Sequence, residues 1–554
     1  MQGNSFKQKL ISLYGKERGK LTADKLQKII DKAKPKIICK NRSLWDEKDI
    51  TLITYADSFQ ESGTPTLKTL NKFLREYIEG MFSIVHILPF YPSTSDRGFC
   101  PSDFFRVNKE FGWWSDVKAI GRKYRLMTDL ILNHVSLEHY WFKKFLESDP
   151  RYENFFIAFR EDNLPSDEQI KMVRRGRTTP LLNPFNTKKG VRYLWSTYST
   201  GGIIDRADLN YHNSEILLEM IRVYLFYLEK GMRILRFDGV GGLWKELGTT
   251  CKHLSQNHTI VSLFRGIMDK VSCGSLIFTE TTTASFEENI SYLNNKEAHV
   301  VYNFALAPHV LLAFYTESAE KLGVFIDRLK TDSGSNTFFN ILDVHDGINM
   351  YAASRMLGKN DLQIIFDGVK NRCGEFSYRN LPDGGKEIKE MHITWWSALS
   401  KDGEEPFELQ LRKFITSRAI AMSFAGIPAV YYLSLFGAKN DTKAYEATQH
   451  GRDINRTNLF YKEISEKLSD KNSREFNIFN ALMNLVEKRR SLKAFHPNAK
   501  QEVLYLDPRV FAIVRGEGKS KVLALHNVSK QKVSLHYQNK NYTLDPYSYS
   551  WNIL

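Results

Sequence analysis

Short apolar runs recur along this chain, and longer amphipathic stretches fill the intervals between them. The runs are almost continuously apolar, which is typical of parallel strands covered on both faces. Segments 215–228 and 261–271 instead repeat apolar residues with helical spacing. The alternation predicts an α/β fold, a (β/α)₈ TIM barrel, with its eight strands at 51–55, 84–90, 126–132, 232–238, 275–280, 299–304, 337–343 and 428–432.

The intervals between the predicted strands are uneven. Residues 135–210 after the third strand and 347–407 after the seventh are long enough to form inserted subdomains. Loops on the C-terminal face of a barrel build its active site, so both insertions should frame it. We expect a helical extension at 1–45, the catalytic barrel at 46–465, a helical connection at 466–500 and a small antiparallel β domain at 501–554.

One stretch, residues 419–438, carries no charge over twenty residues, which is long enough for a membrane span. The sequence Gly426-Ile427-Pro428 interrupts its middle and is followed by β-prone residues. A buried helix, a turn and a buried strand explain this pattern better than a membrane helix does. We therefore expect no membrane partner.

Charge and cysteine content limit the possible binding partners and the cellular location. The net charge is +15, and residues 1–42 contribute twelve Lys/Arg against three Asp/Glu. Such a segment is either an arm for nucleic acid or membrane surfaces or the solvated side of amphipathic helices, and its apolar spacing favours the second. No apolar signal segment opens the chain. Widely spaced cysteines indicate reduced thiols and a cytoplasmic location, at Cys39, Cys100, Cys251, Cys273 and Cys373.

Three carboxylates follow predicted strands four, five and seven: Asp238, Glu280 and Asp346. A carboxylate at the end of a buried strand is costly unless it is paired or functional, and three such ends meet at one barrel mouth. Retaining glycosyl transfer uses one carboxylate as nucleophile and a second, protonated one as acid and later base. A third can stabilise the transition state. Arg236, two residues before Asp238, should keep that carboxylate ionised.

These positions resemble the signatures of the α-amylase superfamily of retaining glycoside enzymes. The four matching segments are Asp129-Leu130-Ile131-Leu132-Asn133-His134, Arg236-Phe237-Asp238, Phe278-Thr279-Glu280 and Asp343-Val344-His345-Asp346. The resemblance implies that Asp238 is the nucleophile, Glu280 the acid/base and Asp346 the transition-state stabiliser. It also implies that His134 and His345 bind the sugar.

A narrower resemblance is to the sucrose phosphorylase group. It rests on Ile53-Thr54-Tyr55-Ala56-Asp57-Ser58-Phe59, Ser95-Asp96-Arg97-Gly98-Phe99, Leu243-Trp244-Lys245-Glu246 and Asp453-Ile454-Asn455-Arg456, among others. The N-terminal extension and Trp45-Asp46-Glu47 look most like the glucosylglycerate phosphorylase members. This resemblance implies that Asp96 and Arg456 clamp one glucosyl unit, with Phe99 against its ring. The segment Arg175-Gly176-Arg177 is similar to a loop near the phosphate and acceptor position.

Some residues depart from the group's pattern. Gly242 stands where an aromatic is frequent, and Thr282 where the group has Asn. Both fall on the acceptor side, so the acceptor is left open among glycerate, fructose, its phosphate and glycerol. Arg206 and the loop of Arg175 and Arg177 favour an anionic acceptor, with glycerate first.

The expected reaction is phosphorolysis of a small α-glucoside to α-glucose 1-phosphate, with inorganic phosphate as co-substrate and no metal or other cofactor. Asn133 matches a position that binds calcium in many amylases, but the phosphorylase group generally does without that ion. An α-glucosidase or transglucosidase would use the same site with water or a sugar hydroxyl. A non-catalytic barrel scaffold is a remote alternative, because all three carboxylates are present. We expect a monomer or homodimer and no nucleic-acid partner.

Overall fold

The computed structural model describes residues 2–39, 43–199, 204–330, 334–381, 384–401 and 403–554. Within these ranges, eight parallel strands close into one barrel. Each of the eight predicted apolar runs overlaps one of these strands, which confirms the (β/α)₈ fold. The strands are β1 (Thr51–Thr54), β3 (Ile84–Ile87), β4 (Arg125–Ile131), β10 (Ile234–Asp238), β11 (Leu276–Thr279), β12 (Val300–Tyr302), β13 (Thr337–Asn340) and β17 (Ile427–Tyr431).

Strand register determines which side chains meet at the barrel mouth. β10 lies between β4 and β11, with Asp238 beside Ile131 and Phe237 beside Thr279. Because all eight strands are parallel, their C-terminal ends share one rim. Asp238 ends β10 and Glu280 directly follows β11, so these two carboxylates stand on neighbouring strands at that rim.

Helices link the strands. They include α3 (Thr66–Tyr77), α4 (Trp114–Ile120), α7 (Ser214–Glu229), α8 (Ser255–Val271), α10 (Leu306–Thr316), α11 (Glu320–Asp327) and α14 (Phe407–Ser423). The uncharged stretch 419–438 divides as expected: α14 ends at Ser423, Gly426 adopts φ 129°, and β17 begins at Ile427. None of the described helices is long and apolar enough to cross a membrane.

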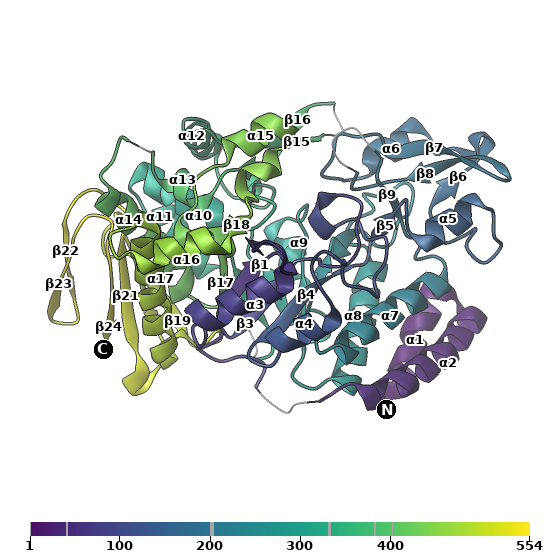
Figure 1. Ribbon diagram of the computed structural model, residues 1–554, viewed down its shortest axis with the longest axis horizontal. Coiled ribbons are helices and arrows are strands. Elements are labelled where there is room, and N and C mark those ends of the chain that lie inside the picture. The colour runs from purple at the N-terminus through teal and green to yellow at the C-terminus, as the bar shows by residue number, and fades with distance from the viewer. Residues whose placement is uncertain (1, 40–42, 200–203, 331–333, 382–383, 402) are drawn as a thin grey trace.

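Both long intervals form small subdomains of their own. After β4, the chain builds β5 (His134–Ser136), α5 (Tyr140–Leu146), β6 (Ala158–Phe159), α6 (Asp167–Met172), β7 (Leu182–Thr187), β8 (Gly190–Trp195) and β9 (Arg206–Asp208). After β13 it builds β14 (Ile348–Asn349), α12 (Lys359–Lys370), β15 (Glu375–Asn380), β16 (Lys386–His392) and α13 (Trp395–Leu399). Figure 1 shows both subdomains along the upper side of the molecule.

The C-terminal part begins with helices α16 (Tyr461–Ser469) and α17 (Arg474–Ser491). A four-stranded antiparallel sheet and a separate hairpin follow, and Figure 1 shows them at the left end of the long axis. Their strands are β19 (Gln501–Leu504), β20 (Val510–Arg515), β21 (Val522–Asn527), β22 (Val533–Tyr537), β23 (Lys540–Leu544) and β24 (Tyr549–Ile553).

The basic N-terminal extension forms two helices, α1 (Gln2–Tyr14) and α2 (Lys16–Ala33), at the right of Figure 1 beside α7 and α8. They cross closely at Gly19, where a Cβ would lie 2.5 Å from the Cα of Ile11. The side chains of Leu10 and Ile30 are fully buried. The Tyr14 hydroxyl donates to the Tyr211 carbonyl at 3.1 Å. The apolar side of the extension is thus packed against the barrel, as the amphipathic spacing indicates.

The cysteines differ from the sequence expectation. Cys39, after the N-terminal helices, forms a disulfide with Cys273 in the turn before β11, although 234 residues separate them. The expectation that all five thiols are reduced is therefore wrong for this pair. Cys100, Cys251 and Cys373 are free. Sequence spacing could not reveal the pair, because it depends on where the extension packs on the barrel.

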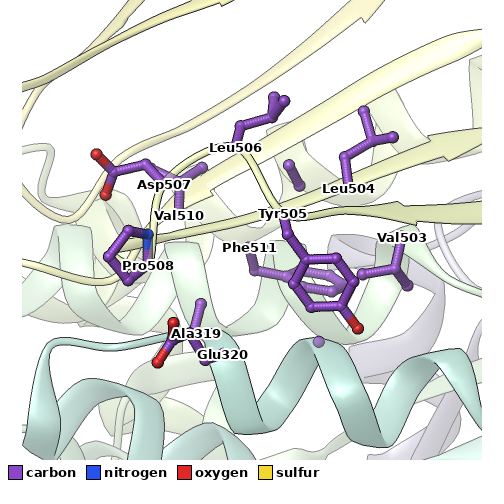
Figure 2. A pocket seen from close by; sticks show the side chains of 12 residues that line it. Ala319, Glu320, Val503, Leu504, Tyr505, Leu506, Asp507, Pro508, Val510 and Phe511 are labelled. Atoms are coloured by element: carbon purple, nitrogen blue, oxygen red, sulfur yellow. The ribbon is translucent and has the colours of Figure 1, made fainter.

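A shallow pocket lies at the seam between the barrel and the C-terminal sheet. Figure 2 shows Tyr505, Pro508 and Phe511 on the sheet side of this pocket, above Ala319 and Glu320 near the start of α11. None of the predicted site residues lines it. We interpret it as a packing seam between two parts of the chain.

Candidate active site

The three predicted carboxylates line one small pocket at the C-terminal rim of the barrel. The space between its walls, open solvent included, is about 410 Å³. The Gly239 N–H, directly after Asp238, donates to Glu280 Oε2 at 2.9 Å. The pocket is lined by Asp96, Phe99, His134, Arg177, Tyr198, Arg206, Asp238, Gly239, Glu280, Thr282, His345, Asp346, Lys389 and Arg452.

Asp238 receives an ion pair from Arg236, whose Nη1 lies 3.0 Å from Asp238 Oδ1. The same Nη1 also bonds Asp129. Burial, together with the negative charges of Glu280 and Asp129, raises the pKa of Asp238 to about 7 against the pull of Arg236. Arg236, whose charge Asp129 shares, thus lowers the pKa of Asp238 as expected but does not offset the effect of burial.

The other two carboxylates have opposite electrostatic environments. Burial raises the pKa of Glu280, although Arg236 and the Gly239 N–H oppose the shift. Burial would also raise the pKa of Asp346, but Arg452, at 2.8 Å, and His345 lower it to about 2. Glu280 is thus prepared to carry a proton and Asp346 to stay negative.

A network of arginines surrounds Asp96. Arg456 Nη1 lies 3.1 Å from Asp96 Oδ1, and Arg452 Nη1 lies 3.3 Å from it. Burial opposes ionisation of Asp96, but these arginines and Arg206 hold its pKa well below the usual range. Asp96 itself adopts φ 52°, a left-handed conformation that is rare for a non-glycine residue and is often found at functional sites.

Aromatic and imidazole rings complete this part of the pocket. Phe99 stacks on His345 with ring centroids 4.6 Å apart and an interplanar angle of 6°. His134 Nε2 lies 2.9 Å from the Phe99 carbonyl. Burial lowers the pKa of His345 to about 3 and that of His134 to about 4, so both rings are neutral. We call Asp96, Phe99, His345, Arg452 and Arg456 the donor side.

Arg206 belongs to this network. Its Nη2 lies 2.7 Å from Asp205 and its Nη1 lies 3.7 Å from Asp96. The sequence reasoning counted Arg206 in favour of an anionic acceptor, but its charge is already balanced by two aspartates. That interpretation of Arg206 is therefore corrected.

The two arginines of the predicted phosphate loop, Arg175 and Arg177, lie in different places. Arg177 lines the pocket, and its hydrogen bonds go to the backbone carbonyls of Tyr198 and Gly176 at 3.4 and 3.5 Å. Arg175 does not line the pocket and donates to the Thr179 carbonyl. Of the two phosphate candidates, the structure thus brings only Arg177 to the carboxylates. We call Arg177, Tyr198, Thr282 and Lys389 the acceptor side.

The two positions that depart from the family pattern lie nearby. Thr282 lines the pocket, and its carbonyl accepts from Asn349 Nδ2 at 3.0 Å. Gly242 does not line the pocket; a Cβ at this glycine would lie only 2.6 Å from Lys252 Nζ. The space that a side chain at 242 would need is therefore taken by a lysine ten residues later.

Asn133, which matches a calcium-binding position of many amylases, bonds a lysine in this structure. Lys245 Nζ donates to Asn133 Oδ1 at 2.6 Å and lies 2.9 Å from Asp208 Oδ2. An internal ammonium group thus pairs with both oxygen groups. No cluster of three metal-ligating side chains is found among the described residues.

Several pocket residues were not predicted as site residues. Arg452 pairs with Asp96, Asp346 and Glu390. Lys389, from β16, lines the acceptor side and pairs with Glu390 at 2.6 Å. Arg452 stands four residues before Arg456, and this spacing could have suggested that both arginines face the same pocket. No local signal marked Lys389 or Tyr198, because loop folding alone brings them to the pocket.

Comparisons with known proteins agree with this geometry. The family model for the α-amylase catalytic domain matches residues 54–346. A glucosylglycerate phosphorylase from Spirochaeta thermophila is 39% identical over 93% of this chain and 88% of its own length. Another from Allomeiothermus silvanus is 40% identical, covering 92% of each chain.

Among solved structures, sucrose 6F-phosphate phosphorylase from Thermoanaerobacter thermosaccharolyticum superposes with a TM-score of 0.77 at 24% identity, over 90% of this chain and 97% of that one. At that identity the superposition speaks for the fold alone. The matches to the full-length relatives carry the assignment: the chain belongs to the α-amylase family, on the branch that contains the glucosylglycerate phosphorylases.

Proposed function

We propose that this protein is a retaining α-glucoside phosphorylase that transfers a glucosyl unit from a small α-glucoside to inorganic phosphate. The observation that carries the proposal is the pairing of Asp238 with Glu280 on neighbouring strands, inside one pocket that also contains Arg177. The family supports the same reaction. The product is α-glucose 1-phosphate, formed with retention because two inversions take place.

In the first step, Asp238 attacks the anomeric carbon while Glu280 gives its proton to the leaving oxygen. The raised pKa of Glu280 supports its role as an acid. Asp346 stays negative beside the positive charge that develops at the anomeric carbon. The bond between the anomeric carbon and the leaving oxygen breaks as the bond to Asp238 forms, and the acceptor departs as a neutral hydroxyl that carries the proton from Glu280.

In the second step, a phosphate oxygen attacks the glucosyl carbon and its proton passes to Glu280, which restores both carboxyl groups. Arg177 supports the phosphate, because a guanidinium presents a fixed fork of donors to an oxyanion. Among the described residues its hydrogen bonds are long and go only to backbone carbonyls, which leaves its charge for a ligand. The proposal requires no metal ion and no organic cofactor.

Glycerate is the first candidate for the acceptor, ahead of fructose, fructose phosphate and glycerol. The named relatives that match over most of the chain act on glucosylglycerate, as their names state. We place the enzyme in the cytoplasm as a monomer or homodimer. A charged sugar phosphate does not cross a bilayer, so its product is used in the compartment where it forms.

The test incubates the protein with α-glucose 1-phosphate and one acceptor at a time. The acceptors are D-glycerate, fructose, fructose 6-phosphate and glycerol. Phosphate release that requires an acceptor, greatest with glycerate, is expected. Release at the same rate without any acceptor would instead identify a hydrolase. The Asp238→Asn variant should lose turnover by about 10⁴-fold or more with every acceptor, because the covalent step is removed.

A further inference from the structure

A tight turn places Lys252 beside the pocket. Cys251 and His253, on either side of it, adopt φ 52° and 54°, which is unusual for non-glycine residues. The His253 N–H donates to the Gly241 carbonyl at 2.8 Å, and the Cys251 N–H donates to Thr249 Oγ1 at 3.0 Å. The surrounding structure thus fixes a costly backbone shape, and that shape delivers a lysine inward.

Lys252 is a buried amine. Its side chain donates to the Tyr198 hydroxyl at 2.8 Å. Among the described residues, no carboxylate lies within 4.0 Å of Lys252 Nζ. Burial and the positive charges of Lys245 and Arg174 lower the pKa of Lys252 to about 7. Because burial disfavours the ammonium form, an anion bound in the pocket would stabilise that form and restore the charge.

The hydrogen bond also fixes the direction of the Tyr198 hydroxyl. A charged lysine can only donate, so the Tyr198 oxygen accepts from Lys252 and must use its own hydrogen elsewhere. The structure gives that hydrogen no acceptor among the described residues. Tyr198 lines the pocket with Asp238 and Glu280, and its oxygen would lie 3.1 Å from a Cβ on Gly239. The hydroxyl therefore offers a donor at the acceptor side.

Gly242 makes this arrangement possible. A Cβ there would lie 2.6 Å from Lys252 Nζ, too close for any side chain unless the ammonium group moves. The glycine at 242, which departs from the family pattern, and the position of the Lys252 side chain thus depend on each other.

We propose that Tyr198 and Lys252 form a recognition site for the carboxylate of a hydroxy-acid acceptor. The proposal rests on the phosphorylase function above. The Tyr198 hydroxyl donates to the acceptor's carboxylate, and the ammonium charge of Lys252 stands directly behind it. A single directed donor backed by one ammonium suits a monoanion, whereas the guanidinium fork of Arg177 suits the phosphate that occupies the same side in the other half-reaction.

The test compares two acceptors in the same variant, so that a general loss of activity cancels. The kcat/KM for D-glycerate divided by that for glycerol, both with α-glucose 1-phosphate, should fall about 10–100-fold in Lys252→Met and in Tyr198→Phe. The fall should appear mainly as a higher KM for glycerate. Lys252→Arg should keep part of the preference, and Gly242→Ala, which displaces the ammonium, should lower it.

Lys143→Met is the matched control. It removes an exposed lysine that pairs with Glu138 at the surface and should leave the ratio unchanged. An unchanged ratio in Lys252→Met, with both acceptors impaired alike, would show that Lys252 is only structural and would overturn the proposal. A wild-type enzyme that prefers fructose would overturn it too and leave phosphorolysis intact. Acceptor-independent phosphate release would contradict the proposed function itself.

Discussion

The donor and acceptor sides of the pocket differ in how their charges are balanced. On the donor side, Asp96 and Asp346 lie within 4 Å of Arg452 and Arg456. Near the acceptor side, Lys389 pairs with Glu390, but Arg177 and Lys252 have no carboxylate that close among the described residues. One region is therefore electrostatically complete before any ligand arrives, and the other is not.

This difference matches what each side is proposed to bind. A glucosyl unit is neutral, so it is best held by fixed hydrogen-bonding groups whose own charges are already paired. Phosphate and a carboxylic acid bring negative charge with them. Leaving cations without partners makes those anions part of the charge balance of the protein. The predictions below test whether the two sides can be impaired separately.

The largest effect is expected on the donor side, from Arg456→Lys. Arg456 contacts both Asp96 and the His345 carbonyl, and lysine cannot make both contacts. Breaking a buried ion pair costs about 3–5 kcal/mol, so kcat/KM should fall about 150–5,000-fold. The loss should be equal for hydrolysis of α-glucosyl fluoride and for transfer to every acceptor.

The control for this variant is Arg151→Lys, at an exposed arginine paired with Asp149, which should behave like wild type. A loss in Arg456→Lys that depends on the acceptor would mean that the donor side is not a separate unit.

A smaller and selective effect is expected from Arg177→Gln. The KM for phosphate should rise about 10–150-fold, because a charge-assisted hydrogen bond contributes about 1.5–3 kcal/mol. Hydrolysis of α-glucosyl fluoride, which places no oxyanion on the acceptor side, should fall much less. Steady-state kinetics with each substrate varied in turn measures both. Equal losses in the two assays would contradict the division of the pocket.

The smallest effect concerns pH. Asp346 stays ionised over the working range, because its pKa is about 2, whereas the pKa of Asp238 is about 7. Asp238 attacks only when ionised, so activity is present above pH 7 and is lost as the pH falls through that value. The kcat/KM for α-glucosyl fluoride should fall about 5–10-fold between pH 7 and pH 6.

Because Asp238 and Glu280 interact, the pair titrates together. In Glu280→Gln a neighbouring negative charge is gone, which lowers the pKa of Asp238. The acidic limb, measured in a single turnover with a fluoride leaving group that needs no proton, should therefore move to lower pH. A limb that stays in place would show that another group controls it.

The barrel and its three carboxylates could be predicted from the sequence because both are local features. Eight apolar runs predict buried strands, and Asp238 and Glu280 are read at strand ends without knowing any distant contact. The unpredicted residues depend on long-range packing. Lys252 reaches the acceptor side only through the strained turn at 251–253, and Cys39 meets Cys273 only once the extension is seated. Likewise, the sequence could not show that Arg236 bonds Asp129 as well as Asp238.

The N-terminal helices have a consequence for how the protein is made. Tyr14 contacts Tyr211, 197 residues further along, and α1 and α2 pack on α7 and α8. At about 5–20 residues per second, the ribosome needs roughly 10–40 s to deliver that partner. During this time the segment of α1 and α2 exposes an apolar surface that the barrel does not yet cover. Its many lysines keep this early segment dispersed until the rest of the barrel is synthesised.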